Sequence, residues 1–372
     1  MKRYVFPVAA AVSVALGAAG GALAGAKPAK PHPAPAHVRV GTSLVPRLAA
    51  QPSAWLKGLH KPRPNPRPKP TPKPKAKPAQ PKPKPAPKAP AQQPARSAEQ
   101  RLGTTLSIYE QTTKPWFLGS QGCSAARRHE RGIVVLDFGK PTFKHHGFGT
   151  ILFSGRFADN HKITTAMVAY AHGYVSCLPK RSDAFIEVAR GTSNYQPTVP
   201  SAYDAGRRWA RATNKFASIL RREGLDRHVA AAAADDAEPA WDPGFRKTRD
   251  FFHGFRAATH GHTLYDYGSL DGGVGAIWSA KQAWYVAGGI RHTKALPEIY
   301  NSDMARQWAE LARIARHRYH RGVQFAGVMT QGTSGCGCGL RPHAAHRMLA
   351  HALDDEGVDN VVLPDGGTNI VG

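Results

Sequence analysis

Residues 228–242 read HVAAAAADDAEPAWD, a run of small apolar residues that ends in Asp235, Asp236 and Glu238. An apolar strand that ends in carboxylates is typical of α/β barrels, whose acid–base groups lie at the C-terminal ends of the strands. Side chains alternate along a strand, so Asp236 and Glu238 share one face about 6–7 Å apart, and Asp235 points the other way. Two carboxyl groups on one face can act as a proton donor and an ionised partner. The structural alternative is a charged turn with an aspartate that caps the next helix.

Strand-like and helix-like segments alternate after Arg101 for about 270 residues, the size of one barrel. The alternation predicts a parallel sheet, and eight strands predict closure into an α/β, TIM-like (β/α)₈ barrel over residues 101–335, followed by a C-terminal extension at 336–372. An open doubly wound sheet is the alternative, but no glycine-rich phosphate loop follows the first strand. The expected strands are Gly132–Asp137, Gly149–Ser154, Ala184–Ala189, His228–Asp235, Thr263–Tyr267, Ala283–Ala287, Leu296–Tyr300 and Gln324–Met329.

Helix-like segments lie between these strands. In Ala202–Arg222 the residues Trp209, Phe216 and Leu220 recur near helical spacing, with basic residues on the opposite side. Asp242-Pro243 supplies an N-cap followed by proline at a first helical position. The expected helices are Thr164–Tyr174, Ala202–Arg222, Gly244–Ala258, Val274–Lys281 and Met304–Tyr319.

Residues 1–24 predict a signal peptide. Lys2 and Arg3 precede an apolar, Ala-rich run, and Ala22-Leu23-Ala24 fits the small-x-small cleavage rule. A retained transmembrane anchor is the alternative, because the apolar stretch is nearly long enough to span a bilayer. The many Gly and Ala residues of this stretch make it only weakly hydrophobic, which favours cleavage over retention as an anchor. We therefore expect a secreted or cell-wall-associated protein, monomeric and without a stable membrane anchor.

Residues 25–100 predict a disordered, polyproline-like linker, because they contain 16 Lys or Arg against one acidic residue and 20 of the 31 prolines. Such a basic linker on an exported protein can bind the anionic polymers of a cell envelope. A passive soluble spacer is an equally good interpretation. Nucleic acid is not an expected partner, because the chain is exported and the Lys-Pro stretch lacks stacking aromatic residues.

Four cysteines in an exported chain are expected to be paired. The sequence does not choose among the three possible pairings, but Cys123 and Cys177 lie outside the expected strands and are predicted to form a disulfide. Cys336 and Cys338 with the nearby His343 and His346 offer a metal site as the alternative for the GCGCG segment, although the spacing is unusual for zinc. No HExxH or GxSxG motif is present, and we expect neither a metal nor a cofactor.

Acidic and aromatic residues gather at the expected strand ends. Aromatic rings stack on the apolar faces of sugars, while carboxylates accept hydroxyl hydrogen bonds or act as acid and base. Taken singly, each of these residues could instead be a core aromatic, a cap or half of a surface ion pair. The predicted catalytic residues are Glu238, Asp236 and Asp137, and the predicted substrate-binding residues are Trp241, Tyr265, Tyr267, Glu298, Tyr300 and Gln331.

The sequence resembles the secreted glycoside-hydrolase-like barrels of high-GC Gram-positive bacteria, and more distantly the muramidases of glycoside hydrolase family 25. The residues that carry this resemblance are Asp137 at the end of the first strand, Asp236-Ala237-Glu238 as the family's DxE, the aromatic run 284–287, and Gln331. After Asp137 the sequence departs from the muramidases, with Phe138-Gly139-Lys140-Pro141 where they carry a serine and an aromatic–Gln pair.

The resemblance implies that Glu238 is the general acid, while Asp236 and Asp137 stabilise positive charge at the sugar or orient its N-acetyl group. It implies an exported barrel that acts on a cell-wall glycan by acid-assisted hydrolysis. The alternative is a non-catalytic cell-envelope carbohydrate-binding barrel. Two carboxyl groups facing one open cleft would favour the enzyme, and a Glu238 buried against an arginine would favour the binding protein.

Overall fold

A computed structural model describes residues 104–331, 339–358 and 361–372 of the chain. Its main sheet contains eight strands in the order β10-β11-β1-β2-β6-β7-β8-β9, and every neighbouring pair is parallel. The expected signal peptide, the basic linker, Cys336 and Cys338 lie outside the described residues. The strands are β1 (Thr104–Tyr109), β2 (Gly132–Asp137), β6 (Ile186–Ser193), β7 (Val229–Asp236), β8 (Leu264–Asp266), β9 (Thr293–Ala295), β10 (Val328–Gln331) and β11 (Gly367–Val371).

The two strands at the ends of this order lie against each other. Isolated parallel bridges join Ala295 to Phe325 and Glu298 to Met329. The amide of Ala326 donates to the carbonyl of Ala295 at 2.8 Å. The sheet therefore curls until its edges meet, as in a barrel. The expected α/β class with eight parallel strands is confirmed, and the open doubly wound alternative is wrong.

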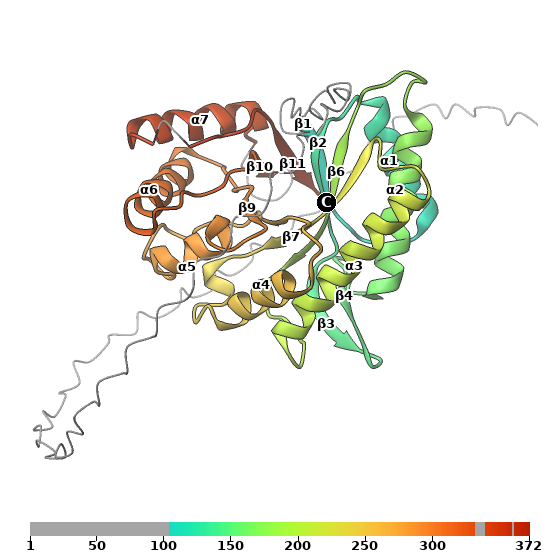
Figure 1. Ribbon diagram of the computed structural model, residues 1–372, viewed down its shortest axis with the longest axis horizontal. Coiled ribbons are helices and arrows are strands. Elements are labelled where there is room, and N and C mark those ends of the chain that lie inside the picture. The colour runs from blue at the N-terminus through green and yellow to red at the C-terminus, as the bar shows by residue number, and fades with distance from the viewer. Residues whose placement is uncertain (1–103, 332–338, 359–360) are drawn as a thin grey trace, which may run out of the picture. The chain divides into compact units, whose positions relative to one another are not determined.

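Helices connect the successive strands of the sheet and, in Figure 1, follow one another around it. Side chains of Ser201 and Asn301 cap the N-termini of two of them. Within the described ranges, no helix combines the length and the apolar character needed to cross a bilayer. The helices are α1 (Pro115–Arg127), α2 (Asn160–Cys177), α3 (Ala202–Arg222), α4 (Arg246–Ala258), α5 (Ala280–Trp284), α6 (Ser302–Tyr319) and α7 (Pro342–Asp355).

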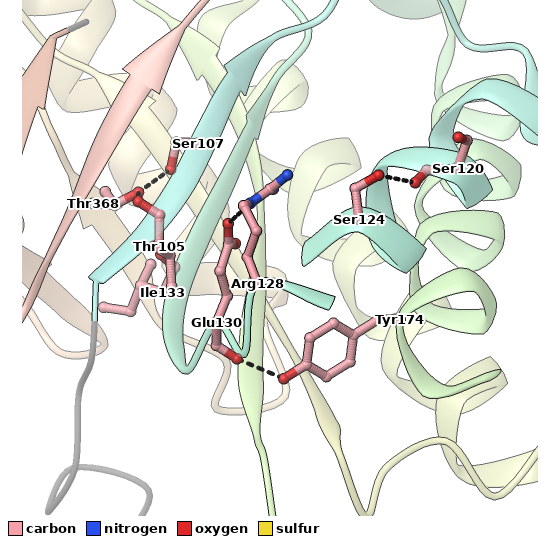
Figure 2. Close-up of polar contacts among 9 residues, drawn as sticks. All are labelled: Thr105, Ser107, Ser120, Ser124, Arg128, Glu130, Ile133, Tyr174 and Thr368. Carbon is pink, nitrogen blue, oxygen red and sulfur yellow. Dashed lines mark hydrogen bonds and ion pairs between the residues drawn. The ribbon is translucent and has the colours of Figure 1, made fainter. Parts of the chain in front are cut away.

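The C-terminal residues complete the sheet, so the domain boundary expected at residue 335 is wrong. Strand β11 lies between β10 and β1, and the hydroxyls of Ser107 and Thr368 are 2.7 Å apart across the β1–β11 pair (Figure 2). Ser107 also accepts a hydrogen bond from the amide of Val135 at 2.8 Å. Residues 361–372 therefore belong to the barrel and are not an extension of it.

Two of the expected strands lie elsewhere in the fold, and a third is displaced, because the sheet strand β9 (Thr293–Ala295) ends before the expected Leu296–Tyr300, which contributes only the bridge of Glu298 to Met329. The residues expected at Gly149–Ser154 contribute to a separate antiparallel sheet of β3 (Lys140–Lys144), β4 (Gly147–Ile151) and β5 (Phe157–Asp159). The residues expected at Ala283–Ala287 are helical instead, in α5 and the π-helical turn Tyr285–Gly289. A capping box between Ser279 and Gln282 begins α5, which explains why the aromatic run does not form a strand.

Glycines let α3 and α4 approach each other closely. A Cβ on Gly206 would lie 2.0 Å from the carbonyl oxygen of Phe251, and one on Gly254 would lie 2.0 Å from that of Tyr203. Backbone atoms cannot move aside without separating the helices. We therefore expect Gly206→Ala to lower the free energy of unfolding, measured by urea denaturation, by about 1–3 kcal/mol. Gly244→Ala is the matched control, since no atom lies within 4 Å of the added Cβ; equal losses would contradict this explanation.

A disulfide joins α1 to α2. Cys123 and Cys177, the predicted pair, are bonded, with their α-carbons 5.1 Å apart. Near the same end of α2, the hydroxyl of Tyr174 donates to the carbonyl of Glu130 at 2.7 Å (Figure 2). These contacts hold the first two helices to the turn that precedes β2.

Candidate active site

The barrel encloses an inner core, separate from the outer core beneath the helices. On β7, Ala232 and Ala234 belong to the inner core, whereas Ala231 and Ala233 belong to the outer one. The alternation continues to the end of the strand. It places Asp236 on the inner face and Asp235 on the outer face, as the sequence predicted.

Three further strands bring polar side chains to the same inner face. Tyr109 on β1 and Tyr267 after β8 pack with the inner core, and Asp137 follows Ile133 and Val135 on β2 at the same two-residue spacing. All of these residues lie at the C-terminal ends of their strands. We call this end of the barrel the mouth.

Asp137 is held beneath the mouth by local geometry. The amide of Gly139 donates to its Oδ1 at 2.8 Å, and the side chain is 1% exposed. Gly139 has φ +80°, and a Cβ there would lie 2.2 Å from the carbonyl oxygen of Ile151. The glycine after Phe138 is therefore required both by the turn and by the β4 backbone that passes over it.

Glu238 is held by contacts to its backbone and to its carboxylate. Asn194 uses its amide side chain twice, donating to the Glu238 carbonyl at 2.9 Å and accepting from the Glu238 amide at 3.0 Å. The hydroxyl of Ser269 lies 3.1 Å from Oε1 of Glu238 and 3.0 Å from Oδ1 of Asp271, so the two carboxyl groups share its one proton. The side chain of Glu238 is partly exposed, whereas those of Asp137 and Asp236 are buried. Glu238 is therefore fixed in position with its carboxyl group partly accessible to solvent.

Burial raises the pKa of the carboxyl groups of the mouth, and nearby carboxyl groups raise those of Glu238 and Glu298 further. Burial raises the pKa of Asp137 to about 6, against hydrogen bonds from Gly139 and Tyr267 that lower it. Burial and the charge of Asp271 raise the pKa of Glu238 to about 7. Burial also raises the pKa of Glu298 to about 8, while a hydrogen bond from Tyr300 lowers it.

Asp236 lies in the environment least favourable to a charged carboxylate. Burial raises its pKa well above the usual range, and the charges of Glu298, Glu238 and Asp137 raise it further. Its Oδ1 is buried without a hydrogen-bond partner among the described residues. Asp236 was expected to stay ionised if it accepts more hydrogen bonds than Glu238; in the structure it is the more buried of the two and its Oδ1 accepts none, which disfavours its charged form.

Aromatic side chains surround the mouth. The rings of Tyr195 and Trp241 meet edge to face at 5.3 Å, and Tyr195 is 42% exposed. Tyr109 packs against Phe153, with ring centroids 4.7 Å apart. These residues follow the ends of β6, β7 and β1 or lie beside them, so the rim offers exposed aromatic surface next to the carboxyl groups.

The predicted site residues are partly brought together. Asp137, Asp236, Glu238, Glu298, Tyr267 and Tyr300 lie close enough to act on one another's pKa. Tyr265 lies deeper, 3% exposed inside the barrel, with its hydroxyl 2.8 Å from Glu187. Gln331 ends β10 and shares its inner face with Met329, two residues before it. Tyr265 is therefore not at the mouth.

Sequence reasoning missed four polar residues of the site. Tyr109 was missed because β1 was not expected as a strand, and Asn194, Ser269 and Asp271 because they follow strands in loops without a motif. Asp271 accepts hydrogen bonds from the Ser269 hydroxyl at 3.0 Å and from the Ala240 amide at 2.7 Å. The positions of Asn194, Ser269 and Asp271 just beyond β6 and β8 are the sequence signal that could have identified them as site residues.

Among the described residues, no three His, Cys, Asp or Glu side chains gather as a metal site would require.

Comparison with known proteins gives no family. No protein-family model matches the chain, and no curated protein matches it. One similar solved structure is a thermostable and highly halotolerant GH5 cellulase from an Icelandic hot spring isolate, with 11% identity and a TM-score of 0.36 over 72% of this chain and 73% of that one. At that TM-score the likeness supports no conclusion, so the fold assignment depends on the strand order and register. The family 25 resemblance stays a prediction.

Proposed function

We propose that this protein is an exported, glycoside-hydrolase-like enzyme that cleaves a cell-wall glycan at the mouth of its barrel. The observation that carries the proposal is a pair of carboxyl groups in different environments. Glu238 is partly exposed with a pKa raised to about 7, and Asp137 is buried with a pKa raised to about 6. Glu238 is partly exposed and can reach a glycosidic oxygen as an acid, whereas Asp137 is held by the Gly139 amide, which favours its ionised form, so the two environments suit the two roles that acid-assisted hydrolysis requires.

In the proposed reaction, Glu238 donates its proton to the glycosidic oxygen as the bond from the anomeric carbon to that oxygen breaks. The ionised Asp137 stabilises the positive charge that develops on the sugar ring. A water molecule then adds to the anomeric carbon, and its proton restores the acid form of Glu238. Burial and the neighbouring carboxyl groups disfavour the charged form of Asp236, so the proposed reaction gives it no part in proton transfer, which differs from the role that the family resemblance implied for it.

Aromatic residues of the mouth are suited to hold the sugar chain. The exposed ring of Tyr195 and the adjoining Trp241 can stack on sugar faces. Tyr300 hydrogen-bonds to Glu298, so both can orient hydroxyl groups. These contacts would position the glycosidic bond beside Glu238.

A non-catalytic carbohydrate-binding barrel is the competing function. In a binding protein we expect a basic residue to pair with Glu238, because an unpaired carboxylate in a partly buried position destabilises the folded state. Within the described ranges, no Lys or Arg forms an ion pair with Glu238, and its hydrogen-bond partner is Ser269. This environment favours the enzyme. The test is the release of reducing ends from purified peptidoglycan; binding without release at any pH from 5 to 8 would favour the alternative.

The basic segment at residues 25–100 supports the proposal that the protein acts at the cell wall. Residues 26–100 hold 16 Lys or Arg against one acidic residue. We propose that these charges hold the exported enzyme near anionic wall polymers by salt-sensitive Coulomb attraction. The barrel then acts on glycan close to its anchoring polymer.

The rate of cleavage is expected to depend on pH in a bell shape. Glu238 must be protonated to act, so kcat/KM falls as the pH rises through about 7. Asp137 must be ionised, so kcat/KM also falls as the pH drops below about 6. Initial rates between pH 4 and pH 9 check this. A profile that rises continuously with pH would contradict the assignment of Glu238 as the acid.

A further inference from the structure

We infer that the outer surface of α3 and α4 binds an anionic polysaccharide, that is, a chain of sugar rings that carry carboxylate groups. We call this surface the basic face, and its charged members are Arg207, Arg208, Arg211, Lys215, Arg249 and Arg256. It lies outside the mouth, and the inference does not depend on the proposed cleavage.

The two helices carry most of the net positive charge of residues 101–372. That part of the chain holds 33 Lys or Arg against 24 acidic residues. Helices α3 and α4 together hold ten Lys or Arg and two Asp. Helices α6 and α7, of similar combined length, hold five Lys or Arg and four acidic residues. The positive charge is therefore a local property of the α3–α4 side of the barrel.

Helical spacing aligns the basic side chains. Arg208, Arg211 and Lys215 are three and four residues apart, so they share one side of α3, and all three are exposed. Arg249 and Arg256 are seven residues apart and share one side of α4, where both are exposed. Each helix therefore presents a basic stripe to solvent.

The two helices are in direct contact, which joins the stripes into one surface. Figure 1 shows α3 and α4 side by side, and the glycines at their crossing leave no room for a side chain between the backbones. The amide side chain of Asn214 on α3 donates to the carbonyl of Ala258 at the end of α4 at 2.9 Å. The rings of Tyr203 on α3 and His253 on α4 meet edge to face at 5.5 Å.

The stripe on α3 lacks counter-charges. Within the described ranges, Arg208, Arg211 and Lys215 form no ion pair, whereas Arg207 lies 3.6 Å from Asp204 on the same helix. Like charges three or four residues apart destabilise a helix by repulsion. A bound anion removes that repulsion, so the surface favours an anionic partner.

Aromatic rings beside the arginines indicate that this partner contains sugars. The guanidinium of Arg207 lies 5.9 Å from the ring centroid of Tyr203, whose side chain is 36% exposed. The guanidinium of Arg208 lies 5.9 Å from the ring centroid of Phe148 on β4. A sugar can stack on such a ring while a carboxylate on the same sugar pairs with the arginine. A polymer of phosphate groups alone would leave the rings unused.

A third pair of this kind lies at the rim of the mouth. The Nζ of Lys140 lies 5.7 Å from the ring centroid of Tyr195, which is on the segment that leads from β6 into α3. The same segment is joined to β3, because the amide of Phe143 donates to the carbonyl of Thr198 at 2.8 Å. Cation–aromatic pairs therefore continue from the basic face to the mouth, as a long polymer requires.

The basic face is less suited to a lipid bilayer. Helices that lie on membranes insert Leu, Phe or Trp side chains below the headgroups. Both helices belong to the described part of the chain, and among their large apolar side chains only Tyr203 is exposed. The surface therefore offers charge and stacking without an apolar edge to insert.

The test measures binding of the full chain to immobilised polygalacturonate at pH 7 in 50–500 mM NaCl. The variant Arg208→Gln/Arg211→Gln/Lys215→Gln should bind at least about fivefold more weakly than wild type at 50 mM NaCl. The slope of log affinity against log salt should also become less steep, because fewer bound charges release fewer counterions. The basic linker is the same in both proteins, so the difference reports on α3.

A matched control removes three charges from another side of the barrel. Arg318→Gln/Arg321→Gln/Arg347→Gln, at exposed positions on or beside α6 and α7, should keep the affinity within about twofold of wild type. Fully methyl-esterified polygalacturonate, which has the same backbone without charge, should lose the difference between the variants.

Tyr203→Ala tests the stacking of sugars. It should weaken binding to polygalacturonate and leave binding to inorganic polyphosphate unchanged, because polyphosphate has no ring to stack. Circular dichroism checks that each variant folds.

Equal affinities of the two triple variants for polygalacturonate would overturn the inference. A Tyr203→Ala variant that binds polygalacturonate as wild type does, or that loses polyphosphate to the same extent, would overturn the assignment to a polysaccharide. Binding of phosphatidylglycerol vesicles that depends on Arg208, Arg211 and Lys215, with polygalacturonate binding unaffected by them, would assign the surface to a membrane and overturn the inference.

Discussion

Glu238→Gln is expected to lower the rate of glycan cleavage by about 10²–10⁴-fold, because glutamine has no proton to donate to the leaving oxygen. The substitution preserves the side-chain length, and the glutamine carbonyl can still accept the hydrogen bond that Ser269 now donates to Oε1 at 3.1 Å. The backbone contacts from Asn194 do not involve the side chain of residue 238 and should persist. The barrel should therefore fold normally. Reducing-end assays and a peptidoglycan zymogram, with circular dichroism for folding, measure both effects.

Asp235→Asn is the matched control for this experiment. Asp235 is 1% exposed on the outer face of β7, and burial raises its pKa well above the usual range. Burial favours its uncharged form and its side chain lies on the face opposite the mouth, so a neutral asparagine of similar shape should leave cleavage largely intact. Loss of activity in Asp235→Asn with normal activity in Glu238→Gln would show that the two faces of the strand have the opposite roles.

Removing the disulfide should give the largest loss of stability. Cys123 and Cys177 are separated by 54 residues in the sequence, and a crosslink over a loop of that size is expected to contribute about 4 kcal/mol by restricting the unfolded chain. The double substitution Cys123→Ser/Cys177→Ser should lower the free energy of unfolding by about that amount. Urea denaturation followed by tryptophan fluorescence measures it.

Ser176→Ala, one residue from the bond, is the control, because its exposed hydroxyl makes a hydrogen bond within its own helix. It should change the free energy of unfolding by less than about 1 kcal/mol. Similar unfolding midpoints for the double-serine variant and the wild type would show that contacts between α1 and α2, and not the crosslink, hold this part of the barrel.

The sequence by itself determined the elements with strong, regular patterns. Helix α3 spans Ala202–Arg222, as its apolar spacing predicted, because a long amphipathic period leaves one way to bury Trp209 and Phe216. The same holds for β7, where the two-residue alternation set the opposite faces of Asp235 and Asp236. The alternation of strands and helices also predicted a parallel sheet, and five of the predicted segments overlap its strands, namely β2, β6, β7, β8 and β10.

Only the tertiary structure decided which short segments complete the barrel. TTLSIY and GTNIV form β1 and β11, but neither contains enough apolar residues to distinguish a strand from a loop. They become strands because each supplies hydrogen-bond partners to the other, across 261 residues at Ser107 and Thr368. The run at Ala283–Ala287 had strand-like residues, yet Trp284 stacks on Tyr319 in a helical setting.

The protonation of the site was also a tertiary property. The sequence brought Asp236 and Glu238 together on one face, and it predicted an ionised Asp236 from those two residues alone. Glu298 and Asp137 come from distant strands, and their charges, together with burial, raise the pKa of Asp236. The order in which these carboxyl groups lose their protons depends on the whole mouth, because each charge acts through space on groups that the chain order keeps far apart.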